Sequence, residues 1–120
     1  MKKISLILLL LISLVDAKDI KEIMKDYTNA WQPLAVDLND GVLIIPLNQN
    51  RITNKIYSAI MQHGVCLSAS LEKWNGVKKI VITNKSVNQG FVFDGGYNEC
   101  KEVLSNKKVN IALLGKTRSL

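Results

Sequence analysis

The residue types that can act as a nucleophile and a base stand closest together at His63 and Cys66, three residues apart. A cysteine thiolate beside a histidine is the arrangement of a nucleophilic enzyme. The chain holds one other cysteine, Cys100, and an even number of cysteines in an oxidising compartment favours a disulfide. Two cysteines and one histidine are too few for a zinc site. We therefore predict a Cys66–Cys100 disulfide, no metal and no cysteine nucleophile.

Three aspartates, Asp37, Asp40 and Asp94, are the other candidates for chemistry. Paired carboxylates act as acid and base in glycoside hydrolysis. All three aspartates lie near asparagine or glycine in turn-like sequences, where aspartate is favoured because it bonds to the local backbone. The segment 37–41 begins like a calcium loop but lacks the remaining ligand spacing and the terminal glutamate. Turn formation is the better account, and a small carboxylate-dependent hydrolase stays as an alternative function.

Gly95 and Gly96 stand between an expected strand and an expected helix, where backbone N–H groups can hold an anion. The pair fits a tight turn equally well, and no cofactor is expected. The segment 89–96 is the most distinctive stretch of the chain, and a functional surface is expected at the tip of its hairpin. The candidate interaction surface combines polar residues of that tip with two tryptophans, a residue type enriched at interface hot spots. Its members are Trp31, Trp74, Asn84, Lys85, Asn88 and Gln89.

Residues 1–17 have the features of a cleavable signal peptide. Two lysines open the segment, residues 4–15 are apolar apart from two serines, and Val15 and Ala17 place small side chains around a cleavage site after Ala17. A helix of that apolar length spans only about 18 Å of the ~30 Å hydrocarbon core, so it is no permanent membrane anchor. No cysteine near the cleavage site accepts a lipid. We expect a soluble product that is exported to the periplasm or secreted.

The remaining residues, 18–120, are expected to form one small domain. They carry 14 basic and 9 acidic side chains, a net charge of +5. The basic residues are spread along the chain, with pairs only at 78–79 and 107–108. Nucleic-acid binders concentrate their charge and interleave aromatic residues, so no nucleic acid is expected. The positive charge favours an acidic partner or an anionic surface of the cell envelope.

Residues 19–31 place apolar side chains at helical spacing, with Asp19 as the cap and Pro33 as the stop. This stripe is expected to pack on the domain, and presentation to a partner is the alternative. The continuous apolar run 42–45 is typical of a strand that is buried on both faces or lies at the centre of a sheet.

Six further elements follow the first helix. The predicted helices cover 51–63 and 98–105, and the predicted strands cover 42–47, 77–83, 87–93 and 109–114. Gly64 is expected to end the first of these two helices. Residues 36–40 are irregular or extended, residues 65–71 fit either a strand or more helix, and residues 116–120 are a frayed basic tail. After the N-terminal helix, the order is therefore β-α-β-β-α-β. It predicts an α+β fold with the ferredoxin-like, split βαβ arrangement of an antiparallel sheet.

Function follows less directly from the residues than the fold does. A short exported chain without an evident nucleophile and base favours a non-enzymatic binding protein, such as an inhibitor, an immunity protein or an accessory subunit of an envelope machine. Its partner would be another envelope or secreted protein. The hydrolase above and a basic module that binds an anionic envelope polymer are the alternatives, and the sequence leaves the oligomeric state open.

Overall fold

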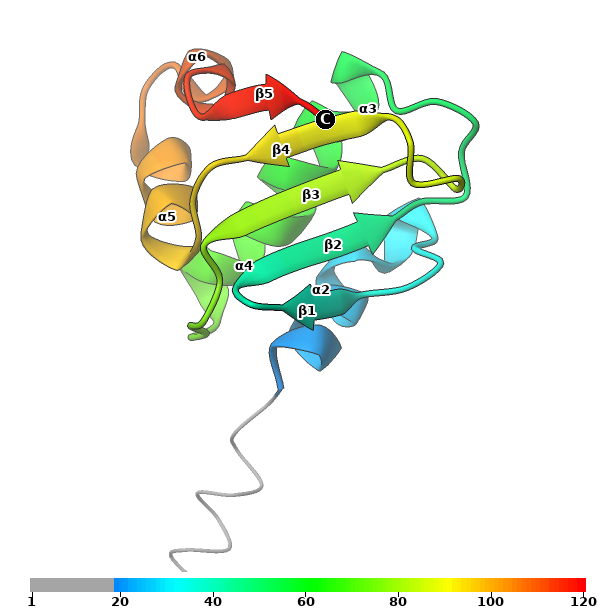
Figure 1. Cartoon of the computed structure of the whole chain (residues 1–120). Coiled ribbons are helices and arrows are strands. Elements are labelled where there is room, and N and C mark those ends of the chain that lie inside the picture. Colours follow the sequence, from blue (N-terminus) through cyan, green and yellow to red (C-terminus); the bar gives the residue numbers. More distant parts are fainter. Residues whose placement is uncertain (1–18) are drawn as a thin grey trace, which may run out of the picture.

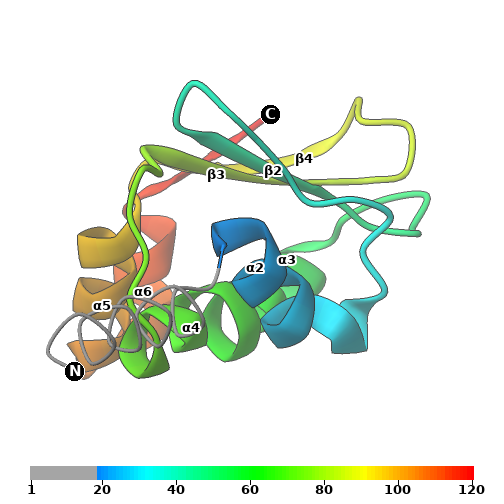
Figure 2. The same ribbon diagram turned by 90° about the horizontal axis from the view of Figure 1, so that it is seen from below.

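The chain builds a five-stranded sheet and packs its helices on one face of that sheet (Figures 1 and 2). The computed structural model describes residues 19–120. The predicted signal peptide, residues 1–17, lies outside the described residues. The strands are β1 (Asp37–Asn39), β2 (Val42–Pro46), β3 (Lys79–Thr83), β4 (Gly90–Phe93) and β5 (Thr117–Ser119). The helices are α2 (Ile20–Thr28), α3 (Asn54–Ile60), α4 (Cys66–Leu71), α5 (Tyr97–Ser105) and α6 (Val109–Leu114), with a 3-10 turn η1 (Asn29–Trp31) and a π turn η2 (Met61–Val65).

The sheet has the order β1-β2-β3-β4-β5, and only β2 and β3 pair in parallel. The fold is thus α+β, as expected, but the ferredoxin-like split βαβ order is not confirmed. In a split unit, another strand separates the two parallel strands, whereas here β3 lies directly beside β2. The short strand β1 follows a tight turn and pairs with the other edge of β2. That edge is therefore occupied, and the C-terminal strand β5 pairs with β4.

The predicted N-terminal helix is confirmed as α2 and η1. Asp19 caps it, because its side chain accepts a hydrogen bond from the backbone N–H of Lys21 at 3.3 Å. Ile23 and Met24 are almost fully buried in the main core. The apolar stripe of this helix therefore packs on the domain, as expected, and is not held out to a partner.

The prediction that Gly64 ends a helix is wrong. Helical structure continues from α3 through η2 into α4, so residues 65–71 extend the helix. Gly64 is buried, and an added Cβ would lie 3.0 Å from the carbonyl oxygen of Tyr27 and 3.2 Å from the ring of Trp31. A glycine is needed here because α2 and η1 cross the π turn at close range, and not because the chain must leave the helix.

The prediction of a strand over 109–114 is also wrong, because this run forms α6. Leu113 is fully buried, while Val109 and Ala112 are half-buried against the core, which is the i, i+3, i+4 spacing of one helical face. A short apolar run cannot by itself separate a buried strand from a helix. The final strand is β5, within the segment expected to be a frayed tail.

The predicted disulfide is confirmed. Cys66 at the start of α4 and Cys100 in α5 are bonded, with their Cα atoms 4.7 Å apart. Both residues are fully buried, so the bond lies within the layer of helices. It joins the crossover between β2 and β3 to the segment that follows β4.

Replacing Gly64 with alanine is expected to lower the free energy of unfolding by about 1–3 kcal/mol, because the methyl group overpacks the contact with Tyr27 and Trp31. Urea unfolding followed by circular dichroism measures this change. Gly115→Ala is the matched control, because its Cβ would meet only ordinary contacts at 3.4 Å or more and its φ of −63° suits alanine. The control is expected to be neutral or slightly stabilising. Equal effects of the two substitutions would contradict the close-approach role of Gly64.

Candidate interaction surface

Among residues 19–120, Figure 2 shows no helix on one face of the sheet. The strand register places a row of apolar side chains across the centre of that face. The strand register aligns Ile44 with Val81 and Val81 with Val92, and Val42 lies two residues from Ile44 on the same face. Val81 and Val92 are buried, yet neither belongs to the main core. We call these four residues the apolar sheet face.

Charged residues lie at both ends of this row. Asp37 on β1 is aligned with Ile44, and Arg118 on β5 is aligned with Val92. The Nε atom of Arg118 lies 3.1 Å from Oδ2 of Asp94, and Nζ of Lys79 lies 3.9 Å from Oδ1 of the same aspartate. These exposed ion pairs contribute little to stability. Asp37 makes the β1 edge of the face acidic, whereas Lys79, Asp94 and Arg118 place charges of both signs near β4 and β5.

The accessible part of the apolar sheet face lies on β2. Val42 and Ile44 are half-buried, whereas Val81 and Val92 are only 8% and 3% exposed because they lie between neighbouring strands. A strand with one face in water normally alternates apolar and polar residues. Here the run 42–45 and the run 80–82 are apolar at every position. The sequence signal for this surface is that continuity. The position of β2 between β1 and β3 agrees with the expected place inside a sheet, whereas burial on both faces is not complete, since Val42 and Ile44 are only half-buried.

The hairpin tip of the predicted surface is a closed hydrogen-bond network. The Asn84 side chain is almost buried; its Oδ1 accepts from the backbone N–H groups of Asn88 and Gln89 at 3.0 and 3.1 Å. Its Nδ2 donates to the Asn50 carbonyl at 3.0 Å. Gln89 bonds both backbone polar groups of Ile52, at 2.6 and 2.8 Å. These side chains hold the loops together at one end of the sheet, and the exposed residues beside them are Lys85, Ser86, Val87 and Asn88.

The structure does not gather the six predicted interaction residues into one surface. Trp74 precedes β3, while Asn84 follows it, so they lie at opposite ends of the strand. Trp74 is 8% exposed, packs edge-on against the Tyr97 ring at 5.1 Å and donates from Nε1 to Ser68 Oγ at 3.1 Å. Trp31 is half-buried in η1, where it packs against the core.

The candidates for catalysis are also kept apart. Asp37 and Asp94 belong to β1 and the end of β4, so β2 and β3 separate them by about 14 Å at the usual strand spacing. Asp40 lies in the β1–β2 turn with a φ of 51°, in keeping with the turn role. His63 is exposed in the π turn, and Cys66 is bound in the disulfide.

Gly95 and Gly96 do not form an open anion site. Both are buried, and the backbone N–H of Gly96 donates to Oε1 of Glu99 at 2.7 Å. The chain's own carboxylate therefore caps the N-terminus of α5. A side chain at Gly96 would collide with the backbone of Val77, which explains the glycine by packing.

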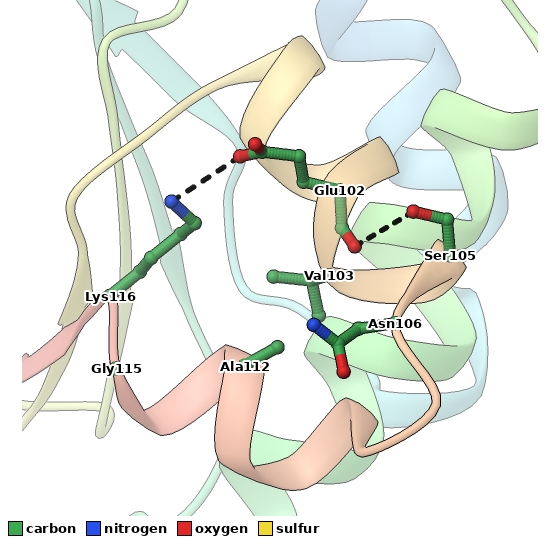
Figure 3. A pocket seen from close by; sticks show the side chains of 7 residues that line it. All are labelled: Glu102, Val103, Ser105, Asn106, Ala112, Gly115 and Lys116. Carbon is green, nitrogen blue, oxygen red and sulfur yellow. Dashed lines mark hydrogen bonds and ion pairs between the residues drawn. The ribbon is translucent and has the colours of Figure 1, made fainter.

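A hollow of about 480 Å³ lies between α5 and the segment of α6 that leads to β5 (Figure 3). Lys116 reaches across it to Glu102, with Nζ 3.4 Å from Oε2. The Ser105 hydroxyl donates to the Glu102 carbonyl at 3.0 Å. The remaining lining residues are Val103, Asn106, Ala112 and Gly115. Figure 3 shows the Lys116–Glu102 ion pair across the opening of this hollow and the side chains of Val103 and Ala112 beside it. The hollow can hold a small polar molecule, but its lining residues include no nucleophile paired with a base.

Tyr57 in α3 anchors the last strand. Its hydroxyl lies 2.6 Å from Thr117 Oγ1, and its ring lies 4.9 Å from the Phe91 ring. Burial raises the pKa of Tyr57 to about 12, with the hydrogen bond to Thr117 lowering it and the charge of Asp94 raising it. The phenol therefore stays protonated at any physiological pH and serves as a structural link.

Within residues 19–120, no group of histidine, cysteine and acidic side chains is placed to hold a metal ion. None of the helices in that range is long and apolar enough to cross a membrane. No family model matches the chain, and comparisons with curated proteins and with solved structures find no match. Any functional assignment therefore depends on the surface of this molecule alone.

The raised pKa of Tyr57 predicts a specific loss of stability in alkali. Between about pH 10 and 12 the unfolded chain releases the phenol proton while the folded chain keeps it. The free energy of unfolding therefore falls as pH rises through this window. Tyr57→Phe lacks this contribution, so its unfolding free energy should change less over the same range. Urea unfolding of both proteins from pH 9 to 12 measures the difference, and parallel pH profiles would contradict a buried phenol.

Asn84→Ala is expected to lower the free energy of unfolding by about 1–3 kcal/mol, because two backbone N–H groups lose their acceptor. Lys85→Ala, one residue along the loop, removes only an exposed side chain and should change stability by less than about 0.5 kcal/mol. Thermal or urea unfolding compares the two. A neutral Asn84→Ala would show that the network does not hold the loops.

Proposed function

We propose that this protein is a small exported, non-enzymatic binding protein, of the inhibitor, immunity or envelope-accessory type, and that it holds another protein on the apolar sheet face. The observation that carries the proposal is the apolar composition of a sheet face that no helix within residues 19–120 covers. A solvated sheet face is normally polar, so aliphatic residues at Val42, Ile44, Val81 and Val92 fit a face that a partner covers.

The rim of this face suits recognition of a folded protein. Asp37 and Arg118 lie at opposite ends of the row, and Lys79 and Asp94 lie beside it. An apolar centre with a charged rim is the usual anatomy of a protein interface. Because Asp37 and Arg118 carry opposite charges at the two ends of the row, a partner with complementary charges can bind in only one of two orientations along it.

The scaffold supports binding at low conformational cost. The two central strands pair along their whole length, and the disulfide fixes the helices behind them. A face that is rigid before it meets its partner loses little entropy on association.

The hydrolase alternative has no comparable support, because the carboxylates it needs lie on separated strands. Binding of an anionic polymer through scattered lysines is also less favoured at the sheet face, where Lys79 and Arg118 both lie against Asp94.

A photo-crosslinking side chain at position 42 is expected to trap a discrete foreign protein in the exporting cell. The substitution Ile44→Lys should weaken this adduct at least about tenfold, since loss of a central apolar contact of an interface costs 1.4 kcal/mol or more. Ile44 lies outside the main core, so the variant is expected to stay folded, which circular dichroism checks.

The matched control places the same crosslinker at Lys55, an exposed position of α3 in the layer of helices. No adduct is expected there. An equal adduct from both positions, no adduct from position 42, or an adduct consisting of two copies of this chain would each contradict the proposal.

A further inference from the structure

Helix α6 exposes two aliphatic side chains side by side. Ile111 is 65% exposed and Leu114 is 55% exposed, and their i, i+3 spacing puts them next to each other on the outer surface of the helix. The inner side of the same helix is occupied by Leu113, Val109 and Ala112. The exposure of Ile111 and Leu114 is therefore not needed for the core to form.

Positive charge surrounds this pair. Lys107 and Lys108 are exposed and come immediately before α6. From residue 103 to residue 120, the chain carries four basic side chains and no aspartate or glutamate. Glu102 lies just before this stretch, and its carboxylate is paired with Lys116 at 3.4 Å. The surface around α6 thus combines exposed aliphatic groups with excess cations.

The opposite end of the molecule lacks this excess of cations, because Lys73 and Lys78 lie there beside a segment rich in acidic residues. Residues 19–40, which form α2, η1 and β1, carry five acidic and two basic side chains. In Figure 1, α6 and β5 lie along one edge of the molecule, and α2 and β1 lie along the other. An anionic surface would therefore attract the α6 edge more strongly than the far edge.

We propose that Lys107, Lys108, Ile111 and Leu114 dock the protein reversibly on an anionic phospholipid surface. The two aliphatic side chains enter the boundary between headgroups and acyl chains, and the lysines lie over the phosphate groups. A hollow of about 420 Å³, lined by Lys107, Lys108, Val109, Asn110 and Ile111, offers room for a headgroup beside the inserted side chains.

The side-chain types favour a lipid surface over a protein partner. Lysine is depleted at protein interfaces, and this patch contains no aromatic residue and no arginine. Lysine beside exposed aliphatic groups is instead typical of segments that lie in a membrane interface. With only two inserted side chains, the binding is weak and salt-dependent, and it does not depend on the sheet-face proposal.

The test is sedimentation with vesicles, using the chain expressed with its full sequence in an exporting bacterium and purified from the exported fraction. Vesicles of phosphatidylglycerol and phosphatidylcholine in equal parts are compared with pure phosphatidylcholine. Binding to the anionic vesicles only is expected, and it should weaken at high salt. The double variants Lys107→Glu/Lys108→Glu and Ile111→Ser/Leu114→Ser should each reduce binding at least about tenfold.

Leu71→Ser is the matched control, because Leu71 is 64% exposed on α4 and lies outside the patch. It should bind as the unchanged protein does. Urea unfolding checks that the helix variants fold, and the lysine variant changes no residue inside α6. No vesicle binding, equal binding to neutral vesicles, unchanged binding of Ile111→Ser/Leu114→Ser, or an equal loss in Leu71→Ser would each overturn the proposal. Binding to polyphosphate without binding to vesicles would overturn it in favour of an acidic polymer.

Discussion

The disulfide between Cys66 and Cys100 is the constraint on which the layer of helices depends. It joins α4, the last part of the crossover from β2 to β3, to α5, which follows β4. Closing a loop over a separation of 34 residues stabilises the fold by about 3–4 kcal/mol in the chain-entropy model. A domain of this size has a total stability of only about 5–15 kcal/mol. One covalent bond therefore holds the two halves of the helical layer together on one face of the sheet.

Because the helices pack on one face of the sheet, the apolar residues on the other face need a separate explanation. Leu43, Ile45, Ile80 and Ile82 point toward the helices and are fully buried. Val42, Ile44 and Val81 alternate with them along the same strands, point away from the helices and are aliphatic too. Water alone does not require aliphatic side chains at the half-buried positions Val42 and Ile44, since a polar residue there would leave the main core intact. The second apolar set is best understood as a surface that acts outside the chain.

Local patterns predicted much of this fold, and long-range contacts decided the rest. The capped helix that begins at Asp19 and the paired cysteines could be recognised from the sequence because each depends on residue types and spacing. Gly64 could not, because its role is set by Tyr27 and Trp31, which approach it from another helix. The run 109–114 was predicted as a strand, but so short an apolar run fits a strand or a helix equally well. The contacts of Leu113 and Ala112 with the core decide for the helix. The apolar sheet face could not be predicted for a similar reason. Continuous apolar strands indicate that both faces of a sheet are covered, but they do not indicate whether this chain or a partner covers the second face.

The two proposed surfaces are compatible in space. β5 follows α6 directly in the chain, and Arg118 on β5 ends the row that begins with Asp37 on β1 (Figure 1). A lipid surface against α6 would therefore lie at the Arg118 end of this row, and the acidic end would point away from the anionic headgroups. The apolar sheet face would then stand at the side of the molecule and not beneath it. In this orientation a partner that is itself attached to the membrane can reach the apolar sheet face without displacing α6 from the lipid.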